Sequence, residues 1–582
     1  MIEWLPPAWI MIVGALLLPL IRGRMRQSVM LALPILSLIH IANLPLGEHL
    51  QWSIFDYTLT LARVDKLSLV FGYIFHLAAI LGVIYSFHVK DPVQQVCALV
   101  YGGAGIAATF AGDWITLFVY WELTAVSSVF LIWARKTERA FASGMRYLIV
   151  QVGSGVILLA GIVLHVWAGG SLAFGKIAEF DWAELGRAVT SLGDAGSAGL
   201  AGALLIFIAF GIKCAFPFLH NWLTDAYPEA TVTGTVFLSA FTTKLAVYAL
   251  ARAFPGSAAL IGIGAAMTAF PIFYAVIEND LRRVLAYSLN NQLGFMVVGI
   301  GVGTEMAING TAAHAFSHIL YKALLFMSMG AVLYRTGKIN GSELGGLYKS
   351  MPWTTAFCIV GAASISGFPL TNGFISKSMI IDATASGHYT ITLLVLLFAS
   401  AGVFHHSGIK IPFFAFFAHD SGIRCKEAPW NMLVAMGLTA FGCLAIGFFP
   451  GPLYDLLPYP VDYKPYTPTH VVTQLQLLLF SALAFSVLMR TGIYPKELRA
   501  INLDTDWVYR WWVPGIWARL TRTSSALTGR ASRLLDSALR RGLSGIYRHH
   551  GPEGLLARSW ATAGSVIWVC VLLLVCLIVY YS

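Results

Sequence analysis

Long apolar stretches recur along this 582-residue chain, and they limit what it can fold into. A helix of about 20 apolar residues matches the hydrocarbon core of a bilayer, and backbone groups inside lipid must be satisfied within the helix. Only 11% of the residues are charged, against about 25% in an ordinary soluble chain. The sequence therefore predicts an all-α polytopic membrane protein. The sixteen stretches lie near residues 4–21, 27–45, 66–87, 93–111, 113–133, 141–168, 198–217, 231–254, 257–277, 284–303, 307–334, 354–384, 389–418, 430–449, 470–490 and 561–581.

The basic residues are distributed unevenly between the loops that join these stretches. Of the 38 Lys and Arg residues, 26 lie in the odd-numbered loops, six in the even-numbered loops and six inside the stretches. Cytoplasmic loops carry an excess of Lys and Arg. We therefore expect the odd loops to face the cytoplasm of a bacterial inner membrane, with the N-terminus outside.

Several classes of site have no signal in the sequence. The seven cysteines never form CxxC spacing, and neither a GxGxxG turn nor a Walker loop is present. The net charge of +10 reports basic loops in a membrane chain rather than nucleic-acid binding. We therefore expect no catalytic, cofactor or metal site in this chain, and no nucleic-acid partner.

Ionisable residues lie inside the apolar stretches, where a central charge costs from about 3 to more than 10 kcal/mol. One such residue alone would be interpreted as a static ion pair or as a lysine reaching the surface. Several such residues together favour a hydrated proton relay. Burial lowers the pKa of a lysine and a nearby carboxylate raises it, so a small rearrangement can move the proton on or off. Histidine titrates near neutrality and can pass protons between lysines. His405, His406 and Lys410 continue the series. The predicted relay residues are Glu122, Lys213, Lys244, His314, His318, Lys322 and Lys377.

Two of the stretches are interrupted by proline close to a buried lysine. Proline lacks an N–H, so each break frees one helical carbonyl, that of Lys213 in the first stretch and that of Ile365 in the second. A broken span beside a buried lysine, occurring twice, is typical of transporters built from two structural repeats. The residues at the predicted breaks are Pro217, Gly367, Pro369 and Gly373.

With these motifs, the chain resembles the antiporter-like subunits shared by Mrp-type sodium/proton antiporters and respiratory complex I. The resemblance covers roughly residues 60–450, and the stretch 400–465 is most similar to the D-type subunit of Mrp-type systems. The matching pieces are Trp121-Glu-Leu-Thr124, Gly211-Ile-Lys213, Pro217-Phe-Leu-His-Asn-Trp-Leu223, Asp225-Ala-Tyr-Pro228, Lys244, Asn290-Asn-Gln-Leu-Gly294, His314 to Lys322 with Ala323-Leu-Leu-Phe326, Gly373-Phe-Ile-Ser-Lys377 and Gly408-Ile-Lys-Ile-Pro-Phe-Phe414.

The resemblance implies about fourteen core helices that contain two inverted five-helix repeats. It also implies that Glu122 and Lys213 are the charged pair of the first half-channel, that Lys244, His318 and Lys322 form a central hydrophilic axis, and that Lys377 is the terminal station. The expected parts are N-terminal helices in 1–92, a first half-channel in 93–254, a second in 257–418, further helices in 430–490, a basic segment in 491–560 and a final span in 561–581.

The basic segment departs from a plain D-type subunit. Between Ile516 and Arg548, apolar residues and arginines recur at helical spacing, which predicts an amphipathic helix of about 33 residues. Such a helix either lies on anionic lipid or braces a partner protein. The distal membrane subunit of complex I has a similar but longer lateral helix.

These features lead to one main functional hypothesis and two alternatives. The main one is a proton-translocating subunit of a multisubunit cation/proton antiporter, working with other membrane subunits on H⁺ and Na⁺. The first alternative is a proton-pumping membrane subunit of an NADH-quinone oxidoreductase or membrane hydrogenase, where redox chemistry belongs to the assembly. The second is a proton-conducting membrane anchor for a soluble enzyme of inorganic-carbon uptake.

Overall fold

The computed structural model describes residues 5–498, 500, 502–559 and 561–582, apart from the side chain of residue 195. Twelve helices in this part of the chain are long and apolar enough to cross a membrane. The protein is therefore a polytopic helical membrane protein, as the sequence predicts. It divides into two units, one ending at Asn502 and one beginning at Leu503.

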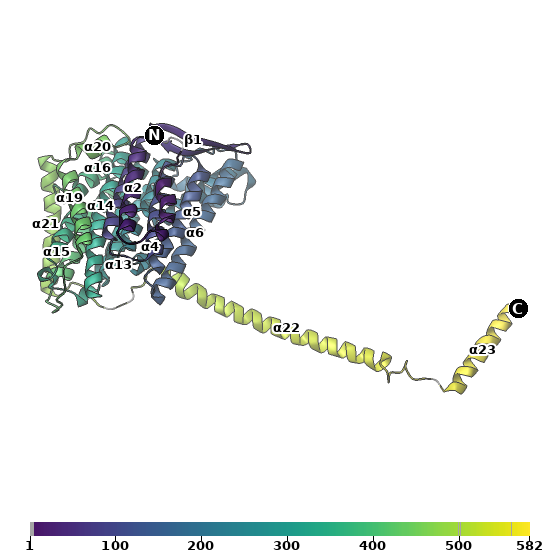
Figure 1. The fold of residues 1–582 in the computed structure, drawn as a ribbon. Coiled ribbons are helices and arrows are strands. Elements are labelled where there is room, and N and C mark those ends of the chain that lie inside the picture. The colour runs from purple at the N-terminus through teal and green to yellow at the C-terminus, as the bar shows by residue number, and fades with distance from the viewer. Residues whose placement is uncertain (1–4, 499, 501, 560) are drawn as a thin grey trace. The chain divides into compact units, whose positions relative to one another are not determined.

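The first unit is a bundle of helices that run side by side (Figure 1). Five of these helices are followed, directly or after a short break, by a second helical segment: α1 by η1, α8 by α9, α10 by α11, α15 by α16, and α17 by the π-helical turns η5 and η6. The helices are α1 (Trp9–Leu16), η1 (Leu18–Leu20), α2 (Gly23–Ala42), α3 (Lys66–Tyr85), α4 (Pro92–Phe110), α5 (Trp114–Trp133), α6 (Glu138–Trp167), α7 (Trp182–Thr190), η2 (Ala195–Ser197), α8 (Ala198–Cys214), α9 (Asn221–Glu229), α10 (Gly234–Ala240), α11 (Thr242–Ala253), α12 (Ala258–Ile277), α13 (Leu281–Val302), α14 (Glu305–Thr336), η3 (Gly341–Glu343), η4 (Leu347–Lys349), α15 (Pro352–Ser366), α16 (Asn372–Ser386), α17 (Thr390–Val403), η5 (Phe404–Ile409), α18 (Lys410–Pro412), η6 (Phe413–Phe417), α19 (Trp430–Phe448), α20 (Gly451–Asp455) and α21 (Pro468–Thr491).

Each of the sixteen predicted stretches contains a helix or a helix divided into two or more pieces, although residue 4 lies outside the described part of the first. At both predicted breaks, the helix ends at a residue with left-handed backbone that lies two positions before the proline. Helix α8 ends at Cys214, before Pro217, because Ala215 adopts the left-handed conformation with φ 62° and the Phe216 N–H bonds back to the Gly211 carbonyl. This return bond is a common way to satisfy the last carbonyls of a helix.

Several local elements between the predicted stretches escape the prediction, including α7 and α20. Two others lie next to parts of the bundle discussed below. A β-hairpin, β1 (Gly47–Ile54) and β2 (Tyr57–Val64), joins α2 to α3 with an antiparallel register that pairs Gly47 with Val64. The short helix α9 follows the break after α8. Neither segment is long or apolar enough to be recognised as a span.

Helix α14 forms the centre of the bundle. It packs against α13, α15, α16, α19 and α3, and nearly all of its side chains are buried. Its neighbour α13 is also buried, even though it carries Asn290, Asn291 and Gln292 in one turn. Buried amides need hydrogen-bond partners, so these two helices place a polar layer inside the membrane domain.

The second unit holds η7 (Val508–Trp512), α22 (Val513–His550) and α23 (Thr562–Tyr581). Helix α22 begins three residues before the predicted amphipathic helix and ends two residues after it. Its described side chains are all solvent-accessible within the chain, and seven arginines follow one face. Helix α23 corresponds to the predicted final span.

Candidate functional site

The first predicted station is built where α8 meets α5. Lys213 is completely buried, one residue before the end of α8. Its Nζ donates to the Trp121 carbonyl at 2.6 Å and to the Thr124 hydroxyl at 3.0 Å, and it lies 4.3 Å from the centre of the Trp121 ring. Neutral oxygens and a ring face therefore hold this ammonium group, in an environment where an unpaired charge is costly.

Glu122 lies on the same turn of α5 but does not form a direct pair with Lys213. No ion pair within 4.0 Å joins the two side chains in the described structure, although each acts electrostatically on the other. The Glu122 side chain is half-buried, and its Oε1 is buried without a hydrogen-bond partner among the described residues. The expected charged pair is thus an interaction across a gap rather than a contact.

The space for this carboxylate comes from a glycine on α6. A Cβ added at Gly155 would lie 1.3 Å from Glu122 Oε1, so any larger residue would displace the carboxylate. By contrast, Gly153 on the same helix has open space at its Cβ position. Gly155 is a site residue that the sequence analysis missed, because only helix packing identifies what a glycine touches.

The next station, Lys244, lies beside the interruption between α10 and α11. Its Nζ donates to the Ser239 carbonyl at 2.6 Å and to the Thr243 hydroxyl at 3.2 Å. Two turns further along α11, Arg252 pairs with Asp65 at 2.8 Å. This pair lines a charged hollow of about 840 Å³, so α11 connects the buried lysine to the surface on that side.

At the centre, α13 and α14 contribute a hydrogen-bonded group. The ring of His314 lies with Nδ1 3.1 Å from the Ser376 hydroxyl and Nε2 3.2 Å from Gln292 Oε1. The Tyr321 hydroxyl donates to the same Gln292 oxygen at 3.1 Å. The phenol and the histidine therefore share one acceptor, the amide oxygen of Gln292, and His314 has defined partners on both ring nitrogens.

His318 and Lys322, one and two turns further along α14, are also completely buried. Neither ring nitrogen of His318 nor Nζ of Lys322 has a hydrogen-bond partner among the described residues. His318 is within electrostatic reach of Lys244, Lys322 and Lys377. Because buried polar groups are normally satisfied by protein or water, this part of the series requires hydration.

The last predicted station, Lys377, lies in the first turns of α16. Its Nζ donates to the Ile365 carbonyl at 3.0 Å and lies 5.3 Å from the ring centre of Phe295. The freed carbonyl that Pro369 predicts is therefore the acceptor for the lysine. Gly367, with φ 71°, ends α15, and Gly373 approaches the Ser364 carbonyl so closely that an added Cβ would lie 1.7 Å from its oxygen.

The structure therefore brings all seven predicted residues into the interior or, for Glu122, to its edge. Helices α8, α11, α14 and α16 contact one another in series, and α5 contacts α8 through the hydrogen bonds of Lys213. It adds Gln292, Tyr321 and Ser376 as partners. The sequence contained a signal for Gln292 in the run of three amides, but none for the other two. The role of each residue in proton movement stays a prediction.

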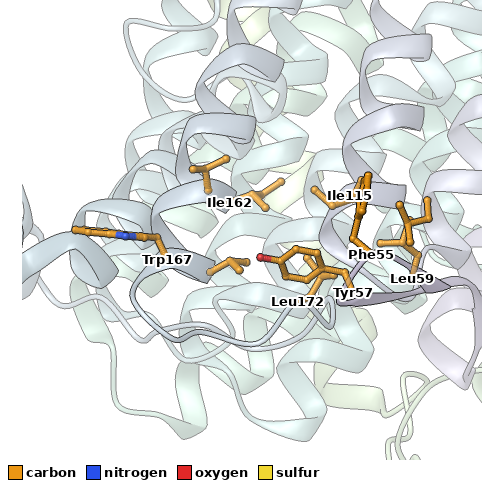
Figure 2. Close-up of a pocket in the computed structure, with 10 residues that line it drawn as sticks. Phe55, Tyr57, Leu59, Ile115, Ile162, Trp167 and Leu172 are labelled. Carbon is orange, nitrogen blue, oxygen red and sulfur yellow. The ribbon is translucent and has the colours of Figure 1, made fainter. Parts of the chain in front are cut away.

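A separate apolar pocket of about 480 Å³ lies away from these residues. Figure 2 shows Phe55 and Tyr57 of the hairpin lining it together with Ile115 and Trp167. The residues that line it carry no acid, base or metal-ligating pair. Among the described residues of the whole chain, no three His, Cys, Asp or Glu side chains gather where a metal ion could be held.

The fold and this interior match one known family. The model of the transmembrane family described as NADH:quinone oxidoreductase/Mrp antiporter matches residues 111–404, half of the chain. That range includes Glu122 and the buried lysines up to Lys377. The chain belongs to this family.

The relatives and solved structures that match include antiporter subunits and a respiratory membrane complex. The chain is 28% identical over 475 residues to the A-type subunit of a Na⁺/H⁺ antiporter of Alkalihalophilus pseudofirmus, covering 74% of this chain and 56% of the relative. The solved Mrp complex from Dietzia sp. DQ12-45-1b matches 93% of this chain and 63% of its own chain, with TM-score 0.74 and 23% identity. An archaeal membrane-bound sulfane sulfur reductase matches 99% of this chain and 100% of its own, with TM-score 0.70 and 22% identity.

The match covers only part of these curated relatives. It spans between 40% and 64% of the lengths of four curated relatives. The two solved structures share the fold at low identity. Substrates, partners and activity are therefore questions for this chain's own residues.

Proposed function

We propose that this chain is a proton-translocating subunit of a multisubunit cation/proton antiporter, similar to the D-type subunit of Mrp-type systems. Other membrane subunits would be its partners, with H⁺ as its substrate and Na⁺ as the exchanged cation of the assembly. The observation that carries the proposal is the series of buried titratable groups from Lys213 to Lys377, on helices that contact one another. A static framework would not require so many costly ionisable groups inside lipid.

In this proposal protons move between Lys213, Lys244, the α14 histidines, Lys322 and Lys377. Glu122 acts on Lys213 through space, because the two side chains interact electrostatically without an ion pair. When Glu122 holds its negative charge, an ammonium form of Lys213 is favoured, and when the carboxylate is neutralised the proton is released. Displacement of the carboxylate is one way in which a neighbouring protein of the assembly could drive proton movement.

The test is proton transport by the assembled complex in sealed membrane vesicles that contain a pH-sensitive dye. We expect Lys213→Ala and Glu122→Ala to abolish transport while the complex still co-purifies and elutes normally. Lys464→Ala, which removes an exposed lysine outside the helices, is the matched control and should transport like the wild type. Full transport by either buried-site variant would contradict the relay.

A second candidate is the proton-pumping membrane subunit of a redox complex. It is favoured by the match to the sulfane sulfur reductase, described as an archaeal respiratory membrane complex, because that match extends over 99% of this chain. Purification in mild detergent, followed by mass spectrometry of the co-purifying subunits, distinguishes the two candidates. Small hydrophobic membrane subunits support the antiporter, whereas flavin or iron–sulfur subunits support the redox pump.

The orientation of the chain in the membrane can be tested separately. The excess of basic residues in the odd loops supports a location in the bacterial inner membrane with the N-terminus outside. Labelling of single cysteines introduced into the β-hairpin, which lies in an even loop, should occur from outside intact cells. Labelling only after lysis would reverse the proposed orientation.

A further inference from the structure

A buried ammonium group outside the predicted relay is held at one end of helix α12. Lys410 lies between the two π-helical turns η5 and η6 and is completely buried. Its Nζ donates to the carbonyls of Ala275 at 3.2 Å, Val276 at 2.7 Å and Glu278 at 2.7 Å. The Glu497 Oε1 lies 2.9 Å from the same nitrogen, and the Glu497 side chain is 6% exposed.

The number of donors and acceptors in this cluster shows which group can exchange a proton. A lysine ammonium has three N–H donors, and the three carbonyls at the C-terminal end of α12 can accept all of them. The C-terminal end of a helix also favours a cation. Lys410 is therefore satisfied as an ammonium whether Glu497 is ionised or protonated, so Glu497 can gain and lose a proton without leaving an unpaired charge behind.

Other polar atoms around this pair have no protein partner. The Glu497 Oε2, the Tyr494 hydroxyl and the Nε2 atoms of His405 and His406 are buried without a hydrogen bond among the described residues. The rings of His405 and Tyr494 lie 5.5 Å apart. Buried polar atoms that lack protein partners are normally satisfied by water, so the cluster has the composition of a hydrated proton path.

His406 links this cluster to the predicted relay. Its Nδ1 lies 2.8 Å from the Ser407 hydroxyl, which donates to the Ser288 hydroxyl of α13 at 2.8 Å. His406 is also within electrostatic reach of Lys322 and Lys377. The histidine therefore lies between the central axis and the pair formed by Lys410 and Glu497.

We propose that Glu497 is a proton-exchanging carboxylate at the surface end of a side path that reaches the central axis through His406. This inference rests on the proposed proton relay and adds a connection to the face on which the α12–α13 loop lies. Glu497 takes up a proton from solution and gives it up to the hydrated cluster, after which its carboxylate pairs again with Lys410. Lys410 is a positioning residue that keeps a fixed positive charge beside it.

The surroundings of Glu497 favour proton exchange at a pH closer to neutrality than an ordinary carboxyl group would allow. Burial raises the pKa of Glu497, the nearby Glu278 adds to the rise, and the ammonium of Lys410 opposes both without cancelling them. Tyr494, His405 and His406 are the other titratable groups of the cluster. A carboxyl group with a raised pKa is half-protonated closer to the working pH, which is the condition for efficient proton transfer.

The test compares Glu497→Gln with Glu497→Asp in the assembled complex, using the same vesicle assay over a range of pH. The amide of Glu497→Gln retains the shape and an acceptor for Lys410 but cannot exchange a proton. We expect it to slow transport by about tenfold or more and to remove an inflection from the pH profile. Glu497→Asp should keep both. Asp420→Asn, which neutralises an exposed carboxylate 2.9 Å from Lys349, is the control and should leave the profile unchanged.

The outcomes separate this inference from the proposed function. A wild-type rate and pH profile in Glu497→Gln, while Lys213→Ala is inactive, would overturn the side path and leave the relay standing. If Glu497→Gln fails to assemble, His406→Asn tests the same path from its inner end. It should slow transport and change the profile as Glu497→Gln would, and unchanged transport by His406→Asn would overturn the proposal.

Discussion

Lys213 and Lys377 both lie beside a break between helices, and both donate to a backbone carbonyl of a neighbouring segment. They differ in the charge that acts on them. A carboxylate, Glu122, acts on Lys213 from the edge of the bundle, whereas the groups within electrostatic reach of Lys377 are the buried histidines His314, His318 and His406. The first lysine can thus be controlled from the rim of the bundle, and the second only from its interior.

The glycines beside the two lysines also have different roles. In the first half, Gly155 leaves space for a side chain that can move. In the second half, Gly373 allows one backbone segment to approach another. The first half is therefore built to adjust an interaction and the second to fix a geometry. Each of the following predictions breaks or sharpens this contrast.

The largest expected effect is the loss of transport when Lys377 becomes arginine. A guanidinium keeps the positive charge but does not release its proton at physiological pH. If Lys377 is a proton station, Lys377→Arg should lower the transport rate by about a hundredfold or more, measured by dye quenching in vesicles that contain equal amounts of complex. Retention of half the wild-type rate would show that Lys377 supplies only charge.

The next largest effect is on stability, at Gly373. An added methyl group would meet the Ser364 carbonyl, which is backbone and cannot rotate away, so Gly373→Ala should destabilise the fold by about 3 kcal/mol. The midpoint of thermal unfolding in detergent measures this. Gly442→Ala, whose Cβ would meet Leu320 at an ordinary 3.6 Å, should leave the midpoint within error. Equal midpoints for the two variants would contradict the close approach.

A smaller and more selective effect is expected at Gly155. Gly155→Ala should push the Glu122 carboxylate aside, weaken its action on Lys213 and slow transport by about tenfold, equivalent to about 1.4 kcal/mol in the barrier. Thermal stability should change little, because the displaced group is a side chain at a half-buried position. The control is Gly153→Ala on the same helix. Equal transport rates in the two variants would show that the position of the Glu122 carboxylate does not control Lys213.

The smallest effect is expected at the outer end of the first half, where Arg252 pairs with Asp65. Burial raises the pKa of Asp65, but the hydrogen bond and charge of Arg252 outweigh it and hold this pKa below its usual value. A lowered folded-state pKa stabilises the fold above the unfolded-state pKa, and this contribution is lost as the pH falls. Because Asp65 is partly exposed, the contribution is below about 1 kcal/mol.

Asp65→Asn should therefore lower the unfolding midpoint slightly at pH 7, and the difference from the wild type should vanish as the pH falls through the folded-state pKa of Asp65. Transport should be largely preserved, since the pair lies at the surface hollow and not on the series of lysines. A difference that persists or grows in acid would contradict the assigned sign.

The spans and the buried charges could be predicted from the sequence, because length and hydropathy determine which segments enter a bilayer. The carbonyl of Ile365 could also be predicted, since proline removes one particular hydrogen bond. The exact end of α8 could not, because the left-handed conformation of Ala215 ends the helix before Pro217 has any effect. The hairpin was missed because its short alternating strands lie outside the apolar stretches.

The gap between Glu122 and Lys213 could not be predicted either. Sequence spacing places a carboxylate near a lysine, but the rotamers and the space left by Gly155 decide whether the two touch. The same limit applies to Glu497, which reaches Lys410 from a segment 87 positions away. Contacts between distant segments depend on packing, which no local pattern encodes.

The central claim is that one buried series connects the two halves, and Lys322 on α14 is the position to test. Proton uptake should be measured in sealed vesicles that carry the wild-type complex, Lys322→Ala or the control Ser328→Ala, which removes a buried hydroxyl from the same helix. The account predicts that Lys322→Ala assembles but takes up no protons, while Ser328→Ala behaves like the wild type. Wild-type uptake by an assembled Lys322→Ala complex would contradict it.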